Sequence, residues 1–157
     1  MTQTNQPSPD VQEMVAQADT GARNPKGIPG RVLWFVPLCW SLFQLWYASP
    51  LPFIFNFGVL NDTQARSIHL AFAIFLAFTA YPALTHSPRD RVPLIDWVLA
   101  FAGSFSAAYI YIFYAALADR SGAPTTPDII FAVIGMLLLL EATRRALGPP
   151  LMVVAAV

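Results

Sequence analysis

Four uncharged, strongly apolar blocks follow one another along the chain, and the charged residues lie in the segments between them. The first three blocks are Val32–Ala48, Ser67–Leu84 and Trp97–Ala118. A helix rises about 1.5 Å per residue, so about 17–22 residues cover roughly the thickness of the hydrocarbon core of a membrane. The blocks are continuously apolar rather than alternating, which is typical of transmembrane helices and not of barrel strands.

The fourth block, Ile129–Leu140, has only twelve uncharged residues and continues through Glu141 to Arg145. It can span a membrane only if its charged ends reach the interface. Its start is well marked, with Thr126 expected as the cap and Pro127 at the first helical position. At its end, Glu141 and Arg145 are spaced as an ion pair one helical turn apart.

These patterns predict an all-α, polytopic membrane protein with four transmembrane helices in an antiparallel bundle and the start of a fifth. We expect a mostly disordered cytoplasmic tail over residues 1–30, a four-helix transmembrane domain over 31–146 and the start of a truncated helix over 147–157. An interfacial amphipathic helix is an alternative for part of the tail. A small protein whose apolar end packs along its own bundle is the alternative for the last segment.

The charge content agrees with a membrane location. Only 11% of the residues are charged against 56% hydrophobic, whereas a soluble domain carries about 25% charged residues. The net charge is zero, which argues against a nucleic-acid partner. On the predicted topology, two basic residues, Arg66 and Arg120, lie on one side. Seven lie on the other, which predicts a cytoplasmic location for both ends of the bundle: Arg23, Lys26, Arg31, Arg89, Arg91, Arg144 and Arg145.

The connection Ser49–Ala65 is long and apolar, and its three phenylalanines recur at every second position. Pro50 and Pro52 prevent the first helix from continuing into it. We expect this segment to lie in the membrane interface or against a partner, because aromatic rings favour that zone. A short β-strand is the competing interpretation.

No catalytic, cofactor-binding or metal-binding residue is predicted, and we do not expect an enzyme. The single cysteine, Cys39, excludes a disulfide within the chain. His69 and His86 lie 17 positions apart, about 25 Å along a helix, so they cannot share a metal or clamp one haem. A hydrogen-bonding role near the interface is favoured for His69 over a ligand role.

The remaining candidates are structural or lie at interfaces between helices. Glu141 is expected to pair with Arg144 and Arg145, which explains an acid at membrane depth. Gly103 forms a small-xxx-small pair with Ala107 and suits close helix contact, and Gln44 suits an interhelical hydrogen bond. Two further expectations are that Asp96 starts the third block and that three tyrosines near its outer end form an aromatic belt: Tyr109, Tyr111 and Tyr114.

Five stretches in order resemble one known family. They read VAQADTGARNPKG, WSLFQLWYASPLPF, LNDTQARSIHLAFAIFLAF, SPRDRVPLIDW and LEATRRALG. They are similar to the N-terminal part of fused permeases of the tripartite ATP-independent periplasmic (TRAP) transporters of the TAXI type. The resemblance covers roughly Val11 to the end of the chain and rests on sequence similarity rather than on catalytic motifs.

The resemblance implies a function in transport. The four-helix part of these permeases is similar to the small Q subunit, which braces the large M portion in the bacterial inner membrane. The M portion carries the substrate and sodium sites, and a periplasmic substrate-binding protein delivers an organic acid. The resemblance therefore implies a scaffold whose partners are the M portion, the binding protein and the lipid bilayer. A stand-alone four-helix subunit of a tripartite transporter and a membrane-bound, cytochrome-like redox protein are the alternatives.

Overall fold

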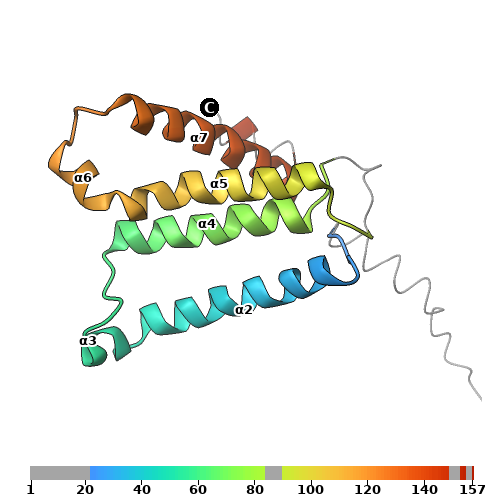
Figure 1. The fold of residues 1–157 in the computed structure, drawn as a ribbon, viewed down its shortest axis with the longest axis horizontal. Coiled ribbons are helices and arrows are strands. Elements are labelled where there is room, and N and C mark those ends of the chain that lie inside the picture. The colour runs from blue at the N-terminus through green and yellow to red at the C-terminus, as the bar shows by residue number, and fades with distance from the viewer. Residues whose placement is uncertain (1–21, 84–89, 149–152, 155–156) are drawn as a thin grey trace, which may run out of the picture.

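The computed structural model describes residues 22–83, 90–148, 153–154 and 157, and within these residues all regular secondary structure is helical. Figure 1 shows the long helices side by side, with the short helices at one end of the molecule. The helices are α2 (Ile28–Ala48), α3 (Leu51–Phe55), α4 (Asp62–Ala80), α5 (Leu94–Ile112), α6 (Tyr114–Asp119) and α7 (Thr126–Leu147). The alternative helix in the tail, His86 and most of the expected fifth helix lie outside the described residues.

Three of the described helices, α2, α5 and α7, are long and apolar enough to cross a membrane. They have 21, 19 and 22 residues. Helix α4 also has 19 residues, but it begins with the polar sequence DTQARS and is less apolar. The all-α prediction and the membrane-spanning character are therefore supported for three helices.

Helix α4 is central. It packs mainly against α5 and also against α2 and α7, and it supplies Ile74 and Phe78 to the core. Two serine hydroxyls tie α4 to α5: Ser67 donates to the carbonyl of Ala107 at 2.7 Å, and Ser104 donates to that of Ala71 at 3.0 Å. Such side-chain bonds between helices suit a lipid environment, where apolar association adds little driving force.

The helix boundaries correct several sequence-based predictions. Helix α2 begins at Ile28, inside the segment assigned to the tail, because Pro29 can occupy a first-turn position that needs no N–H donor. Residues 51–55 form α3 rather than the alternative strand, and the amide of Ile54 donates to the carbonyl of Pro50 at 3.1 Å. The rings of Pro50 and Pro52 fix their φ angles near the value of an α-helix, which favours a helical first turn in α3.

Helix α7 is capped by Thr125 and not by Thr126. Thr125 has an extended backbone, and its amide donates to the carboxylate of Asp128 at 2.8 Å in a capping box. Pro127 therefore takes the second helical position rather than the first. The third block is also interrupted: Phe113 separates α5 from α6, so the helix does not continue to Ala118 as predicted.

Gly103 lies where α5 meets its neighbours most closely. A Cβ atom built there would stand 2.5 Å from Cγ2 of Ile74 on α4 and 3.5 Å from Cβ of Leu138 on α7. Real Cβ atoms do not approach another atom so closely, so only glycine permits this packing. The small residue expected at a helix contact is thus at the junction of three helices.

Gly103→Ala is predicted to destabilise the protein by about 1–2 kcal/mol, because the added methyl group forces Ile74 to move. In an Ile74→Ala background the same change should be neutral or stabilising by up to about 1 kcal/mol, since alanine favours the helix once the clash is gone. Unfolding of the four proteins of this cycle in detergent measures the coupling. Equal effects of Gly103→Ala in both backgrounds would contradict the predicted contact.

Candidate functional site

A buried ionic cluster lies at the end of the molecule where α4 and α7 finish and α5 begins. At its centre is Asp96, in the first turn of α5 and only 2% exposed. One carboxylate oxygen accepts from Arg23 at 2.6 Å and the other from Arg145 at 2.8 Å. The helix dipole also favours an acid at this position. Asp96 therefore begins its helix near the predicted position, but its main role is to bridge two arginines.

Arg23 joins the segment before α2 to the end of α4. Its backbone amide donates to the carbonyl of Ala80 at 2.7 Å. Its guanidinium lies 3.4 Å from the carbonyl of Phe78 and 3.5 Å from that of Thr79. These carbonyls lie in the last turn of α4, where a cation is favourable because the helix leaves them without partners.

Helix α7 supplies the rest of the cluster. Glu141 accepts from Arg144 at 2.7 Å and from Arg145 at 2.8 Å, so one carboxylate pairs with both arginines that follow it. Arg144 also donates to the carbonyl of Ala83 at 3.1 Å. The Arg145 guanidinium lies 4.7 Å from the ring centroid of Phe78, a cation–π distance. The cluster, hereafter the ionic cluster, consists of Arg23, Asp96, Glu141, Arg144 and Arg145.

A second polar group joins α5, α6 and α7 at the opposite end. The carboxylate of Asp128 accepts from the hydroxyl of Tyr109 at 2.6 Å and from Arg120 at 2.8 and 3.1 Å. Tyr109 is 8% exposed and stacks on Phe131. The prediction that Tyr109 belongs to an aromatic belt is therefore wrong, because its hydroxyl has a buried partner inside the bundle.

Helix α2 is joined to α4 by His69. The indole N–H of Trp40 donates to Nδ1 of His69 at 2.7 Å, and Nε2 of Gln44 lies 3.4 Å from the same atom. An indole nitrogen only donates, so Nδ1 accepts and the proton of the neutral ring is on Nε2. The Phe43 ring packs edge-on against the imidazole, with centroids 5.1 Å apart. Gln44 and His69 thus meet at one contact between helices.

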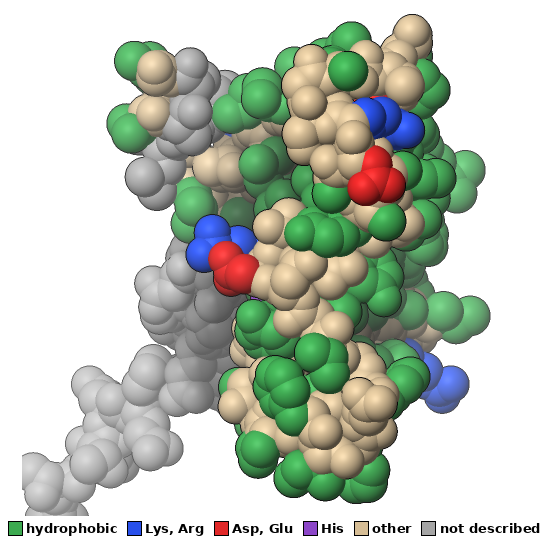
Figure 2. Space-filling model, turned by 90° about the vertical axis from the view of Figure 1, so that its left-hand side faces the viewer, with side chains coloured by type: hydrophobic (Ala, Val, Ile, Leu, Met, Phe, Trp, Pro, Cys, Tyr) green, Lys and Arg blue, Asp and Glu red, His purple; other side chains and the backbone are tan. Residues whose placement is uncertain are grey.

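The charged residues segregate between the two ends. Figure 2 views the end that carries α3 and α6, where side chains are mostly hydrophobic and few are charged. Its charged residues are Asp62, Arg66, Asp119, Arg120 and Asp128. The opposite end holds, among the described residues, six basic and three acidic side chains: Arg23, Lys26, Arg31, Arg91, Arg144, Arg145, Asp90, Asp96 and Glu141.

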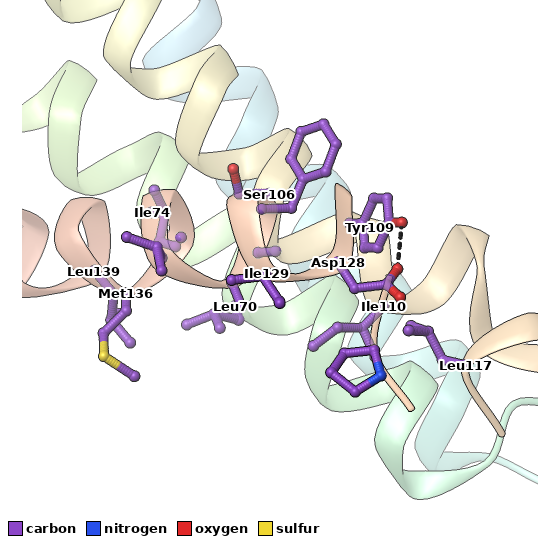
Figure 3. A pocket seen from close by; sticks show the side chains of 16 residues that line it. Leu70, Ile74, Ser106, Tyr109, Ile110, Leu117, Asp128, Ile129, Met136 and Leu139 are labelled. Atoms are coloured by element: carbon purple, nitrogen blue, oxygen red, sulfur yellow. Dashed lines mark hydrogen bonds between the residues drawn. The ribbon is translucent and has the colours of Figure 1, made fainter. Parts of the chain in front are cut away.

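An open apolar groove of about 610 Å³ runs between α4, α5 and α7 toward the end that carries α6. Figure 3 shows Leu70 and Ile74 of α4 facing Ile129 and Met136 of α7, with the Tyr109–Asp128 hydrogen bond at one end. Within the part of the chain that the structure describes, no cluster of three His, Cys, Asp or Glu side chains has the arrangement of a metal site.

Comparisons of the chain with protein-family models, with curated proteins and with solved structures find no match. The resemblance to TRAP permeases therefore remains a prediction from the quoted stretches. What sequence reasoning missed is the pairing of Arg23 with Asp96 across 73 positions. A signal was present: an acid at the start of an apolar block requires a cation if it is buried.

Replacing the central acid tests the ionic cluster. Asp96→Asn leaves two buried arginines without their shared counter-ion and is predicted to cost about 3–5 kcal/mol. The matched control is Asp62→Asn, which breaks the exposed Asp62–Arg66 pair of α4 and should cost less than about 1 kcal/mol. Unfolding of both variants in detergent is the measurement. A similar small loss in both would show that the buried bridge contributes little.

Proposed function

We propose that the chain is the scaffold portion of a TRAP-type secondary-transporter permease. In this proposal it forms a four-span antiparallel bundle in the bacterial inner membrane and braces the M portion, which carries the transport site. Uptake of an organic acid would be sodium-coupled and served by a periplasmic binding protein. The observation that carries the scaffold role is that the buried charged side chains of the described residues bind one another and join helix ends.

The surface of the bundle supports a membrane location. Large apolar side chains point outward on every long helix that qualifies as a span, and examples are Trp34 at 70% exposed, Phe101 at 61% and Met136 at 66%. A soluble protein of this size rarely exposes so much contiguous apolar surface. Helix α4 is the fourth span in this proposal, since its central position requires less apolar character than a lipid-facing helix does.

The distribution of charge supports the orientation. The end with the ionic cluster holds six of the eight described basic residues, and the end with α6 holds two. Basic residues favour the cytoplasmic side of an inner membrane. In this proposal the ionic cluster is cytoplasmic, and α3 and α6 lie on the periplasmic side, where the binding protein would dock.

Cysteine labelling tests the orientation. In a Cys39→Ser background, Ser121→Cys next to α6 should react with a membrane-impermeant maleimide on intact cells. Asp90→Cys, at the opposite end, should react only after lysis. Both positions are exposed, so a difference in labelling would report the side of the membrane on which each residue lies and not its burial in the protein. The reverse labelling pattern would refute the orientation.

Transport tests the function itself. Deleting the gene is expected to abolish sodium-driven uptake of at least one member of a panel of radiolabelled organic acids. A copy encoding Asp62→Asn should restore uptake, and one encoding Asp96→Asn should not, because the scaffold needs its buried bridge. Unchanged uptake across the panel would reject the proposal. A Soret absorption band in the purified protein would favour the cytochrome-like alternative.

A further inference from the structure

A second open groove, of about 480 Å³, lies between α2 and α4 near the ionic cluster, and Ala146 of α7 also lines it. We call it the α2–α4 slot. Its walls include Leu33, Pro37 and Trp40 from α2 and Ala73 and Ala80 from α4, and Arg23 borders it at one end. The slot therefore has mostly apolar walls and reaches one member of the ionic cluster at one end.

The sequence explains why the two helices leave this space. Ala73, Ala77 and Ala80 recur at helical spacing on the face of α4 that borders the slot, and their short side chains cannot fill it. Opposite them, Pro37 lacks an amide proton, so the carbonyl of Leu33 receives no helical hydrogen bond from that position. The helices are held together beyond the slot by Trp40 and His69.

The ionic cluster carries an excess of positive charge. It contains three arginines and two acids, and its Asp96 carboxylate is shared by two of the arginines. The Nε atom of Arg23 has no hydrogen-bond partner among the described residues. Two acids only partly balance three arginines in this cluster, so the net positive charge at this end of the slot attracts an anion. Exposed Lys26 and Arg31, near the start of α2, add positive charge at the same end.

The geometry points to the α2–α4 slot as a binding site for an anionic phospholipid. One acyl chain lies along the apolar walls, and the phosphate lies at the mouth of the slot beside the ionic cluster. The Arg23 side chain is fully covered, so the phosphate acts on it through electrostatic attraction rather than by direct contact. This inference rests on the proposed membrane location, but not on transport.

Native mass spectrometry of the full chain in detergent tests the site. The lipids are phosphatidylglycerol and phosphatidylcholine with the same acyl chains. We expect one tightly bound phosphatidylglycerol, with an affinity at least fivefold higher than that of phosphatidylcholine. Ala73→Phe fills the slot and should weaken phosphatidylglycerol binding at least fivefold. The matched control is Ala108→Phe, which fills a different apolar groove, lined mainly by α4 and α5 with Val36 of α2, and should change binding less than twofold.

Two further results decide the role of the charge. Arg23→Gln removes the excess positive charge and should abolish the preference for phosphatidylglycerol. If the Arg23→Gln protein does not fold, the Ala73→Phe variant still tests the site. Inorganic phosphate at the same concentration should not displace the lipid. Equal affinity for both lipids, equal effects of the two phenylalanine variants, or displacement by phosphate would overturn the inference. Failed uptake with an intact lipid preference would reject the transport proposal alone.

Discussion

The carboxylate of Asp96 is the contact on which the rest of the bundle depends. It is almost completely buried, and each of its oxygens holds an arginine from a different part of the chain. Through Arg23 it fixes the segment before α2 against the last turn of α4, and through Arg145 it fixes the end of α7. One side chain thus sets the relative positions of four helix ends. Removing it would leave buried cations behind, so its loss is expected to weaken all of these contacts together.

Polar contacts hold the helices together because apolar packing contributes little to helix association inside a membrane. The core of the described residues is small, and many large apolar side chains of α2 and α7 face outward, Trp34 and Met136 among them. The helices are joined instead by the ionic cluster at one end, by Asp128 at the other, and by serine and histidine contacts between them. Most of these contacts join different helices or turns, which fixes register as well as distance. Such fixed register is the property that the proposed scaffold role requires.

The sequence predicted the parts that local patterns determine. Continuous apolar runs located the four long helices, and the spacing of Glu141 and Arg145 predicted their contact. The start of an apolar block could suggest that Asp96 needs a cation, but the sequence could not identify Arg23 as that cation, because a charged residue in a proline-rich segment looks the same whether solvated or buried. Tyr109 was misassigned for a similar reason: its partner Asp128 lies 19 positions away, beyond a turn whose path no local pattern defines. The cap at Thr125 was missed by one position because Thr126 offers the same side chain.

Helix α4 shows why the least apolar of the four long helices occupies the middle. A helix that faces lipid all round must be apolar all round, whereas one surrounded by protein can carry polar groups provided that each has a partner. Helix α4 carries Ser67 and His69, which bond to α5 and α2, and its last carbonyls meet Arg23. Its alanines face α2 and leave the slot there rather than a tight contact. Much of the low hydropathy of α4 comes from its exposed start, where Asp62 and Arg66 form a surface pair, and Ser67 and His69 add polar groups that are paired with neighbouring helices. The short alanines on its other turns leave room for the proposed lipid chain between α4 and α2.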